Sequence, residues 1–406
     1  MPPEGHGPEV SGGGSRHASG HPRRPTTALQ RLLGGVVVAA AVLALLGLVW
    51  LWPGDLGVDG SDQPELVSAR VLAVEVVAPA GPRADLSPLD ASGLILLDVV
   101  VLEGEQEGVV LGLDLPAEGY PEFRIGDVVE LLPAEVPGQG TTWFVTDVRR
   151  LGALGWLAAA FVGGVLLVGR WRGLRALLGL GLSLAVVVGF MLPAILSGGS
   201  PPLVALVGGT LILLVTLHLS HGRGPMTTAA AVGTLGALVL TVVVALVAID
   251  GARITGLPDE DAVLARFALG ELDLRGLVLA GLIVAALGVL DDVTVAQAST
   301  VLAVHGADPS QTFAQLVARG MQVGRDHIAS VINTLFLAYA GASLGLLVLF
   351  STSGLPASEL VNSELVATEL VRTMVGSLGL LAAVPLTTLI AAASVAGTTP
   401  AGSRGH

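Results

Sequence analysis

Apolar runs of near-bilayer length recur along this 406-residue chain and constrain its fold more than any other feature. Hydrophobic residues make up 52% of the sequence and charged residues only 13%. A helix needs about 20 mostly apolar residues to cross the hydrocarbon core of a bilayer. The sequence therefore predicts an all-α polytopic membrane protein with about eight transmembrane helices. We expect these spans at 33–52, 151–169, 176–197, 202–220, 227–249, 276–290, 328–350 and 374–397.

A different kind of segment, residues 53–150, separates the first span from the others. Short β-rich runs bounded by Pro, Gly and Asp predict five strands. These strands are expected at 70–77, 94–102, 108–113, 127–132 and 142–148. Five short strands in fewer than a hundred residues favour a small OB-like barrel. We therefore expect a small β-rich domain outside the membrane.

The net charge of −13 is concentrated in this same segment. Residues 55–150 hold 18 acidic residues and five arginines, and the rest of the chain is balanced. Nucleic-acid binding requires a basic surface, so that class of partner is excluded. The expected partners are the lipid bilayer and either further copies of the chain or a second membrane subunit.

Arginine placement predicts the topology. Residues 1–31 form an expected disordered tail, 32–52 the first helix, 53–150 the β-rich domain, 151–397 the multi-span region and 398–406 a C-terminal tail. With the N-terminus inside, 11 arginines fall on the cytoplasmic side and four in short outer loops. Because arginine and lysine favour cytoplasmic loops, both termini are expected in the cytoplasm and the β-rich domain outside.

Polar residues interrupt the apolar pattern at two places, LDDVTVAQAS at 290–299 and VGRDHI at 323–328. Ionisable side chains near a bilayer are costly, and for that reason they are candidates for a functional site. The preceding span at 276–290 is short, so it must begin earlier or continue through the two carboxylates. The candidate substrate- or ion-path residues are Asp291, Asp292, Thr294, Gln297, Arg325, Asp326, His327 and Asn333.

Three interpretations of this cluster compete. The residues line a path for a small solute, ion or proton, which suits carboxylates and histidine. Alternatively they bind a metal together with His218 and His221, which lie three residues apart. In the third interpretation Arg325 pairs with Asp291 or Asp292, and Asp326 and His327 cap a helix. No metal-protease motif, Walker motif or cysteine is present, so we expect neither enzymatic activity nor a cofactor.

The segment between the two motifs has a pattern of its own. Residues 300–319 predict a helix, a Gly-Ala-Asp-Pro turn and a second helix, with Asp308 or Ser310 as the N-cap. Further along, Glu359, Glu364 and Glu369 alternate with apolar residues, which favours an amphipathic helix over 357–372.

The two polar motifs, together with the order of anchor, β-rich domain and multi-span region, resemble the YibE/F family of bacterial membrane proteins. The resemblance extends over about residues 65–397. It implies an integral protein of the bacterial cell membrane without a settled activity, for which transport is the usual suggestion. The leading hypothesis is thus permease-like movement of a small solute or ion. The alternatives are a scaffold or sensor whose outer domain binds a partner, and a metal-dependent intramembrane hydrolase.

Overall fold

The computed structural model describes residues 28–54, 66–77, 93–104, 106–117, 119–136, 140–256, 273–352 and 354–396. Most of the two expected terminal tails lies outside these residues. The chain divides into two compact units, one formed by residues 54–181 and the other by residues 1–53 with 182–406. Each unit has its own core, and they are described separately.

The first unit contains a five-stranded antiparallel sheet. Its strands are β1 Val67–Val77, β2 Leu94–Val101, β3 Val110–Pro116, β4 Val128–Val136 and β5 Gly140–Val148. They pair in the order β3-β2-β1-β4-β5, so the predicted β-rich segment is confirmed as a small sheet, although the pairing does not establish a closed barrel. Ile95, Leu97 and Val99 alternate along β2 into a shared core, as expected when one face of a sheet is buried.

A long helix, α3 Leu151–Val186, follows the sheet and continues through η2 Val187–Met191 into α4 Leu192–Leu196. Arg170 interrupts α3 with φ 49° and ψ −127°. The expected spans at 151–169 and 176–197 are therefore one apolar run in the structure, Leu151–Leu196. The interruption falls between the two predicted spans.

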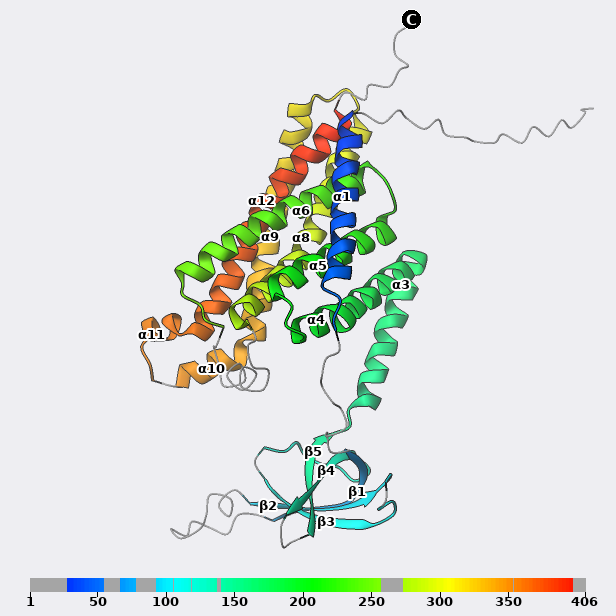
Figure 1. Cartoon of the computed structure of the whole chain (residues 1–406), viewed down its shortest axis with the longest axis vertical. Coiled ribbons are helices and arrows are strands. Elements are labelled where there is room, and N and C mark those ends of the chain that lie inside the picture. Colours follow the sequence, from blue (N-terminus) through cyan, green and yellow to red (C-terminus); the bar gives the residue numbers. More distant parts are fainter. Residues whose placement is uncertain are drawn as a thin grey trace, which may run out of the picture. The chain divides into compact units, whose positions relative to one another are not determined.

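The second unit is a bundle of helices (Figure 1). Besides η2 and α4 it comprises α1 Ala28–Trp50, α5 Pro201–His221, α6 Pro225–Gly251, α8 Leu274–Ala307, α9 Phe313–Ala342, α10 Leu344–Thr352, α11 Ala357–Asn362 and α12 Glu364–Val395. The Gln30 side chain at the start of α1 donates to the Ser394 carbonyl near the end of α12 (2.8 Å). The amide of Gly256, just beyond α6, donates to Glu364 at the start of α12 (2.7 Å). Thus α1 and α6 run opposite to α12, and the start of α1 lies beside the end of α12.

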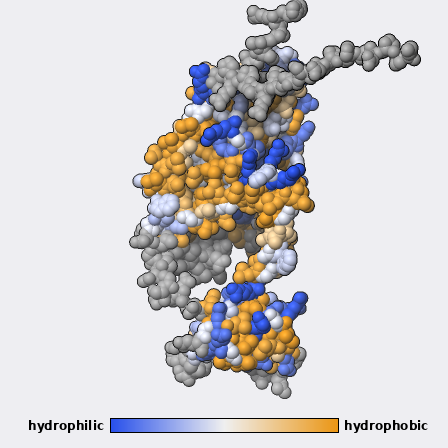
Figure 2. Space-filling model, turned by 90° about the vertical axis from the view of Figure 1, so that its right-hand side faces the viewer, coloured by the Kyte–Doolittle hydropathy of each residue, from blue (hydrophilic) through white to orange (hydrophobic). Residues whose placement is uncertain are grey.

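Six described helical runs are long and apolar enough to cross a membrane. They are Ala28–Trp50, Leu151–Leu196, Pro201–His221, Pro225–Gly251, Leu274–Ala307 and Glu364–Val395. The eight predicted spans are therefore supported as a multi-pass arrangement but not in their number. On the face shown in Figure 2, hydrophobic residues form a broad band across the helical unit. Such a surface suits a lipid environment.

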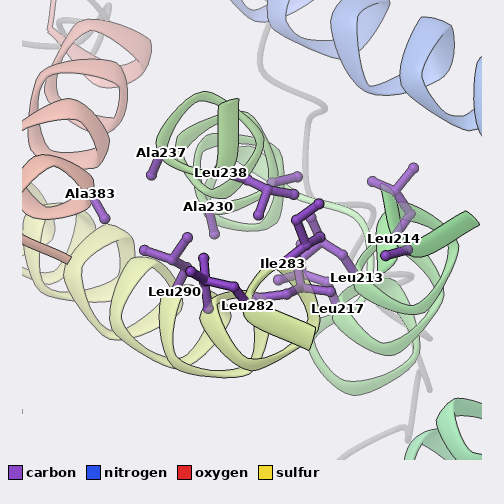
Figure 3. Close-up of a cluster of buried hydrophobic side chains, with 14 of the residues drawn as sticks. Leu213, Leu214, Leu217, Ala230, Ala237, Leu238, Leu282, Ile283, Leu290 and Ala383 are labelled. Carbon is purple, nitrogen blue, oxygen red and sulfur yellow. The ribbon is translucent and has the colours of Figure 1, made fainter. Parts of the chain in front are cut away.

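Leucine and alanine side chains fill the bundle core where α5, α6, α8 and α12 meet (Figure 3). Leu217 from α5, Leu238 from α6, and Ile283 and Leu290 from α8 are almost fully buried, and Ala383 of α12 is fully so. Small residues at such contacts let membrane helices approach closely. This packing fixes the inward face of α8 just before Asp291.

The short span at 276–290 was expected to begin earlier or to continue through the two carboxylates, and it does both. It belongs to the 34-residue helix α8, which begins at Leu274 and continues through both carboxylates to Ala307. Charged side chains do not end a helix, because its backbone hydrogen bonds are satisfied internally. The span at 328–350 is divided at Ser343 between α9 and α10, and α9 is not among the six apolar runs.

The turn between α8 and α9 was predicted correctly, but its cap was not. Thr312 is the N-cap of α9 and forms a capping box with Gln315, which satisfies two otherwise free helix donors. Asp308 instead closes the turn by accepting from the Ser310 hydroxyl (2.5 Å) and amide (3.1 Å). These hydrogen bonds hold the pKa of Asp308 below its usual range. The expected amphipathic helix at 357–372 is divided between α11 and α12 at Ser363.

Candidate functional site

A layer of buried polar side chains crosses the bundle where α6, α8 and α12 meet. This buried polar layer consists of Thr234, Thr294, Gln297, Thr387 and Thr388, each no more than 3% exposed. Buried polar groups are costly unless they are hydrogen-bonded. Most of the layer satisfies this condition across helix boundaries.

Gln297 is the best-connected member of the layer. Its amide nitrogen donates to the Gly320 carbonyl of α9 (2.9 Å) and to the Thr388 hydroxyl of α12 (2.7 Å). One turn earlier on α8, the Thr294 hydroxyl lies 2.6 Å from that of Thr234 on α6. Side chains on two successive turns of α8 therefore form hydrogen bonds to three neighbouring helices, α6, α9 and α12.

Glycines bring α9 close enough for these bonds. A Cβ atom at Gly324 would lie 2.5 Å from Val384 Cγ1, and one at Gly320 would lie 2.8 Å from Val301 Cγ2. Both separations are shorter than normal carbon contacts. The two glycines, spaced four residues apart on one face of α9, seat this helix directly against α8 and α12.

Asp291 begins the polar part of α8. It lies one turn before Thr294, whose hydroxyl donates to the Asp291 carbonyl (3.1 Å). Its carboxylate oxygen Oδ1 is buried and has no hydrogen-bond partner among the described residues. The next residue, Asp292, is exposed. Of the two adjacent carboxylates, only Asp291 has an enclosed oxygen.

The structure places the remaining predicted residues apart from this layer. Arg325, Asp326, His327 and Asn333 are exposed on α9. None of the ion pairs among the described residues joins Arg325 to either carboxylate of α8. Two of the eight predicted path residues, Thr294 and Gln297, thus belong to the buried polar layer, and Asp291 adjoins it.

The metal candidates are also dispersed. His218 Nδ1 lies 2.7 Å from the Leu214 carbonyl of its own helix, and His221 is exposed. Within the described ranges no three His, Asp or Glu side chains gather as metal ligands would. The geometry therefore gives the metal interpretation no support.

A family model for YibE/F-like protein matches residues 157–397. The chain belongs to the YibE/F-like family. The matched region runs from α3 to the end of the helical bundle and includes the buried polar layer and both polar motifs. Searches of curated proteins and of solved structures found no match.

Sequence reasoning overlooked part of the layer in this YibE/F-like protein. Thr234, Thr387 and Thr388 were not among the predicted path residues. A periodic signal existed in α6, where Thr227, Thr234 and Thr241 recur every seven residues and are all buried. A repeat of seven places side chains on one face of a helix.

A separate pocket of about 190 Å³ opens between α9, α10 and α12. Its lining is mostly apolar and includes Phe336, Leu347 and Leu370. None of the eight predicted path residues lines it. The pocket is therefore distinct from the polar site of this family member.

Proposed function

We propose that this YibE/F-like protein is a permease that moves a small solute or ion across the membrane. One observation carries the proposal: halfway along a membrane-length helix, the carboxylate of Asp291 has an enclosed oxygen that no described residue hydrogen-bonds. A carboxylate in such a place destabilises the fold unless it binds something. Its natural partners are a proton or a cation.

The surrounding groups suit this role. Asp291 is followed on α8 by Thr294 and Gln297. The side chains of these two residues form hydrogen bonds to α6, α9 and α12, so polar atoms continue from the carboxylate to the neighbouring helices. Hydroxyl and amide oxygens can accept a hydrogen bond or coordinate a hard cation. A mobile proton or ion that leaves Asp291 thus meets further polar atoms rather than hydrocarbon.

The proposed topology places both termini in the cytoplasm of a bacterial cell and the sheet outside. Its support is the distribution of arginines, together with the hydrogen bond that joins the start of α1 to the end of α12. In this topology the two arms of α3 around Arg170 each cross the bilayer, and α9 with α10 forms a further crossing. The number of membrane crossings is then eight, and the outer sheet is a small accessory domain of OB-like fold.

The proposal is tested with a matched pair of carboxylate substitutions. Purified protein is reconstituted in liposomes, and the decay of imposed H⁺, Na⁺, K⁺ and Mg²⁺ gradients is followed with ion-sensitive dyes. Asp291→Asn removes the enclosed charge, so it should reduce transport of the responsive ion at least tenfold. Asp292→Asn alters the exposed neighbour and should leave the rate within about twofold.

Two results would contradict the proposal. One is an Asp291→Asn protein that is folded and as active as the wild type. The other is a wild-type protein that dissipates no gradient faster than protein-free liposomes. The first result would mean that any transport does not use Asp291. The second would favour a scaffold or sensor, in which the polar layer only binds the helices together.

A further inference from the structure

Five polar residues of α9 form a stripe along one exposed face of the helix. Arg319, Gln322, Asp326, Ser330 and Asn333 are separated by three or four residues and all are exposed; these five are the outer stripe of α9. The buried residues of the helix, Leu316, Gly320, Gly324 and Leu335, lie on a different face. At 3.6 residues per turn the centres of the two sets are about three-eighths of a turn apart.

This stripe runs beside the apolar part of the bundle rather than beyond it. The Gly320 carbonyl bonds Gln297 in the buried polar layer, and Gly324 packs against Val384 in α12. Asp326 follows Gly324 by two residues, so it lies near the level of that layer. Charged and amide side chains at this depth face protein or water rather than lipid.

We propose that a second copy of this chain covers the outer stripe of α9 through its own identical stripe. Copies inserted in one membrane share an orientation, so a two-fold axis along the membrane normal sets the two α9 helices parallel. Side chains near such an axis meet their own equivalents, as the a and d positions of a parallel coiled coil do.

The chemistry of the stripe suits pairing with itself. An amide carries both donors and acceptors, so Gln322 and Asn333 can each bond the same residue of the second copy. The stripe and its border contain both signs of charge. Arg325, beside Asp326 in sequence, can therefore reach Asp326 across the axis and offset the repulsion between the two carboxylates.

The proposal concerns assembly and does not rest on transport. It also gives the exposed motif residues a place, because Arg325, Asp326 and Asn333 would then lie at a polar seam between two copies. The buried polar layer of each copy would lie behind that seam.

The chain has no cysteine, which permits a direct test by disulfide cross-linking. Asn333→Cys is made in the full-length protein and oxidised in native membranes. The control Ala338→Cys is also exposed on α9, but it lies five residues on and more than a third of a turn around the helix. Asn333→Cys should give a covalent dimer in at least fivefold higher yield than the control.

A charge reversal provides the second measurement. Asp326→Arg leaves only positive charge near the axis, so native mass spectrometry in detergent should show mostly monomer where the wild type shows dimer. The exchanged pair Arg325→Asp with Asp326→Arg should recover at least half of the dimer. Thermal melting checks that these exposed substitutions leave the fold intact.

The proposal is overturned by equal cross-linking at 333 and 338, or by cross-linked products whose mass is not twice that of the chain. A product of different mass would identify another membrane protein as the occupant of the stripe. A wild type that is monomeric in both native membranes and detergent would overturn it as well.

Discussion

The side-chain amide of Gln297 illustrates how single residues hold this bundle together. It bonds a backbone carbonyl of α9 and a hydroxyl of α12 from a position that is only 3% exposed. Interhelical hydrogen bonds in membrane proteins contribute modestly, on average about 0.6 kcal/mol, because the separated helices also find partners. The loss of two such bonds should have a larger effect than the loss of one.

We expect Gln297→Leu to destabilise the bundle by about 1–2 kcal/mol. The change keeps a comparable volume and removes both donors, so the effect isolates the hydrogen bonds. Thermal unfolding in detergent would measure it. Thr300→Ala, one turn further along α8 at an exposed hydrogen bond within the helix, should change stability by less than about 0.5 kcal/mol. Equal effects of the two substitutions would contradict this account.

Single polar residues could be singled out from the sequence where their side chains are costly to place in any membrane. Asp291, Thr294 and Gln297 stood out because polar residues in an apolar run require a reason. The same reasoning placed Arg325 and Asp326 with them, but the structure puts these two on the outer face of α9. Two helices separated by a turn can meet along any of several faces, and the polar residues alone do not determine which.

At the scale of helices, the seating of α9 depends on residues that have no side chain. Gly320 and Gly324 face α8 and α12, whereas a methyl group added at Gly341, near the end of the same helix, would meet no atom within 4 Å. Three glycines in one helix thus differ in what a side chain would contact. The contact, rather than the glycine itself, is the structural requirement.

Gly324→Ala should therefore destabilise the protein by about 1–3 kcal/mol, because the new methyl group presses α9 away from Val384. Gly341→Ala should be neutral or stabilising by up to about 1 kcal/mol, since alanine favours a helix over glycine. Thermal unfolding of the two variants in one detergent gives the comparison. A Gly324→Ala protein as stable as Gly341→Ala would show that α9 is not packed as the structure has it.

Element boundaries were predictable where apolar and turn residues alternate sharply. The strand at 94–102 was observed at Leu94–Val101, and the span at 202–220 at Pro201–His221. The continuation of the 276–290 span beyond its expected ends could be anticipated because that span is too short to cross a bilayer. The break at Ser343 was missed because the surrounding residues are mostly apolar, although Gly341 and Gly345 on either side of it disfavour a helix.

The whole molecule combines two units whose stability has different origins. The helices of one unit pack through leucine and alanine side chains and a buried polar layer, whereas the sheet of the other encloses an apolar core without such a layer among the described residues. Ala69, Val71, Val99 and Leu131 of that core are at most 1% exposed. The acidity of residues 55–150 gives this part of the chain a net charge that favours solubility.

The sheet should consequently fold without the helices. A fragment of residues 54–150 is expected to be soluble and to unfold cooperatively on heating, as followed by circular dichroism. Val99→Asp places a charge in the sheet core and should abolish the transition, since a buried unpaired charge costs several kcal/mol. Val76→Asp, in β1 at a position 68% exposed, should preserve it. If the wild-type fragment unfolds without a transition, the sheet must depend on the helical unit, and the two parts of the chain would form one cooperative structure.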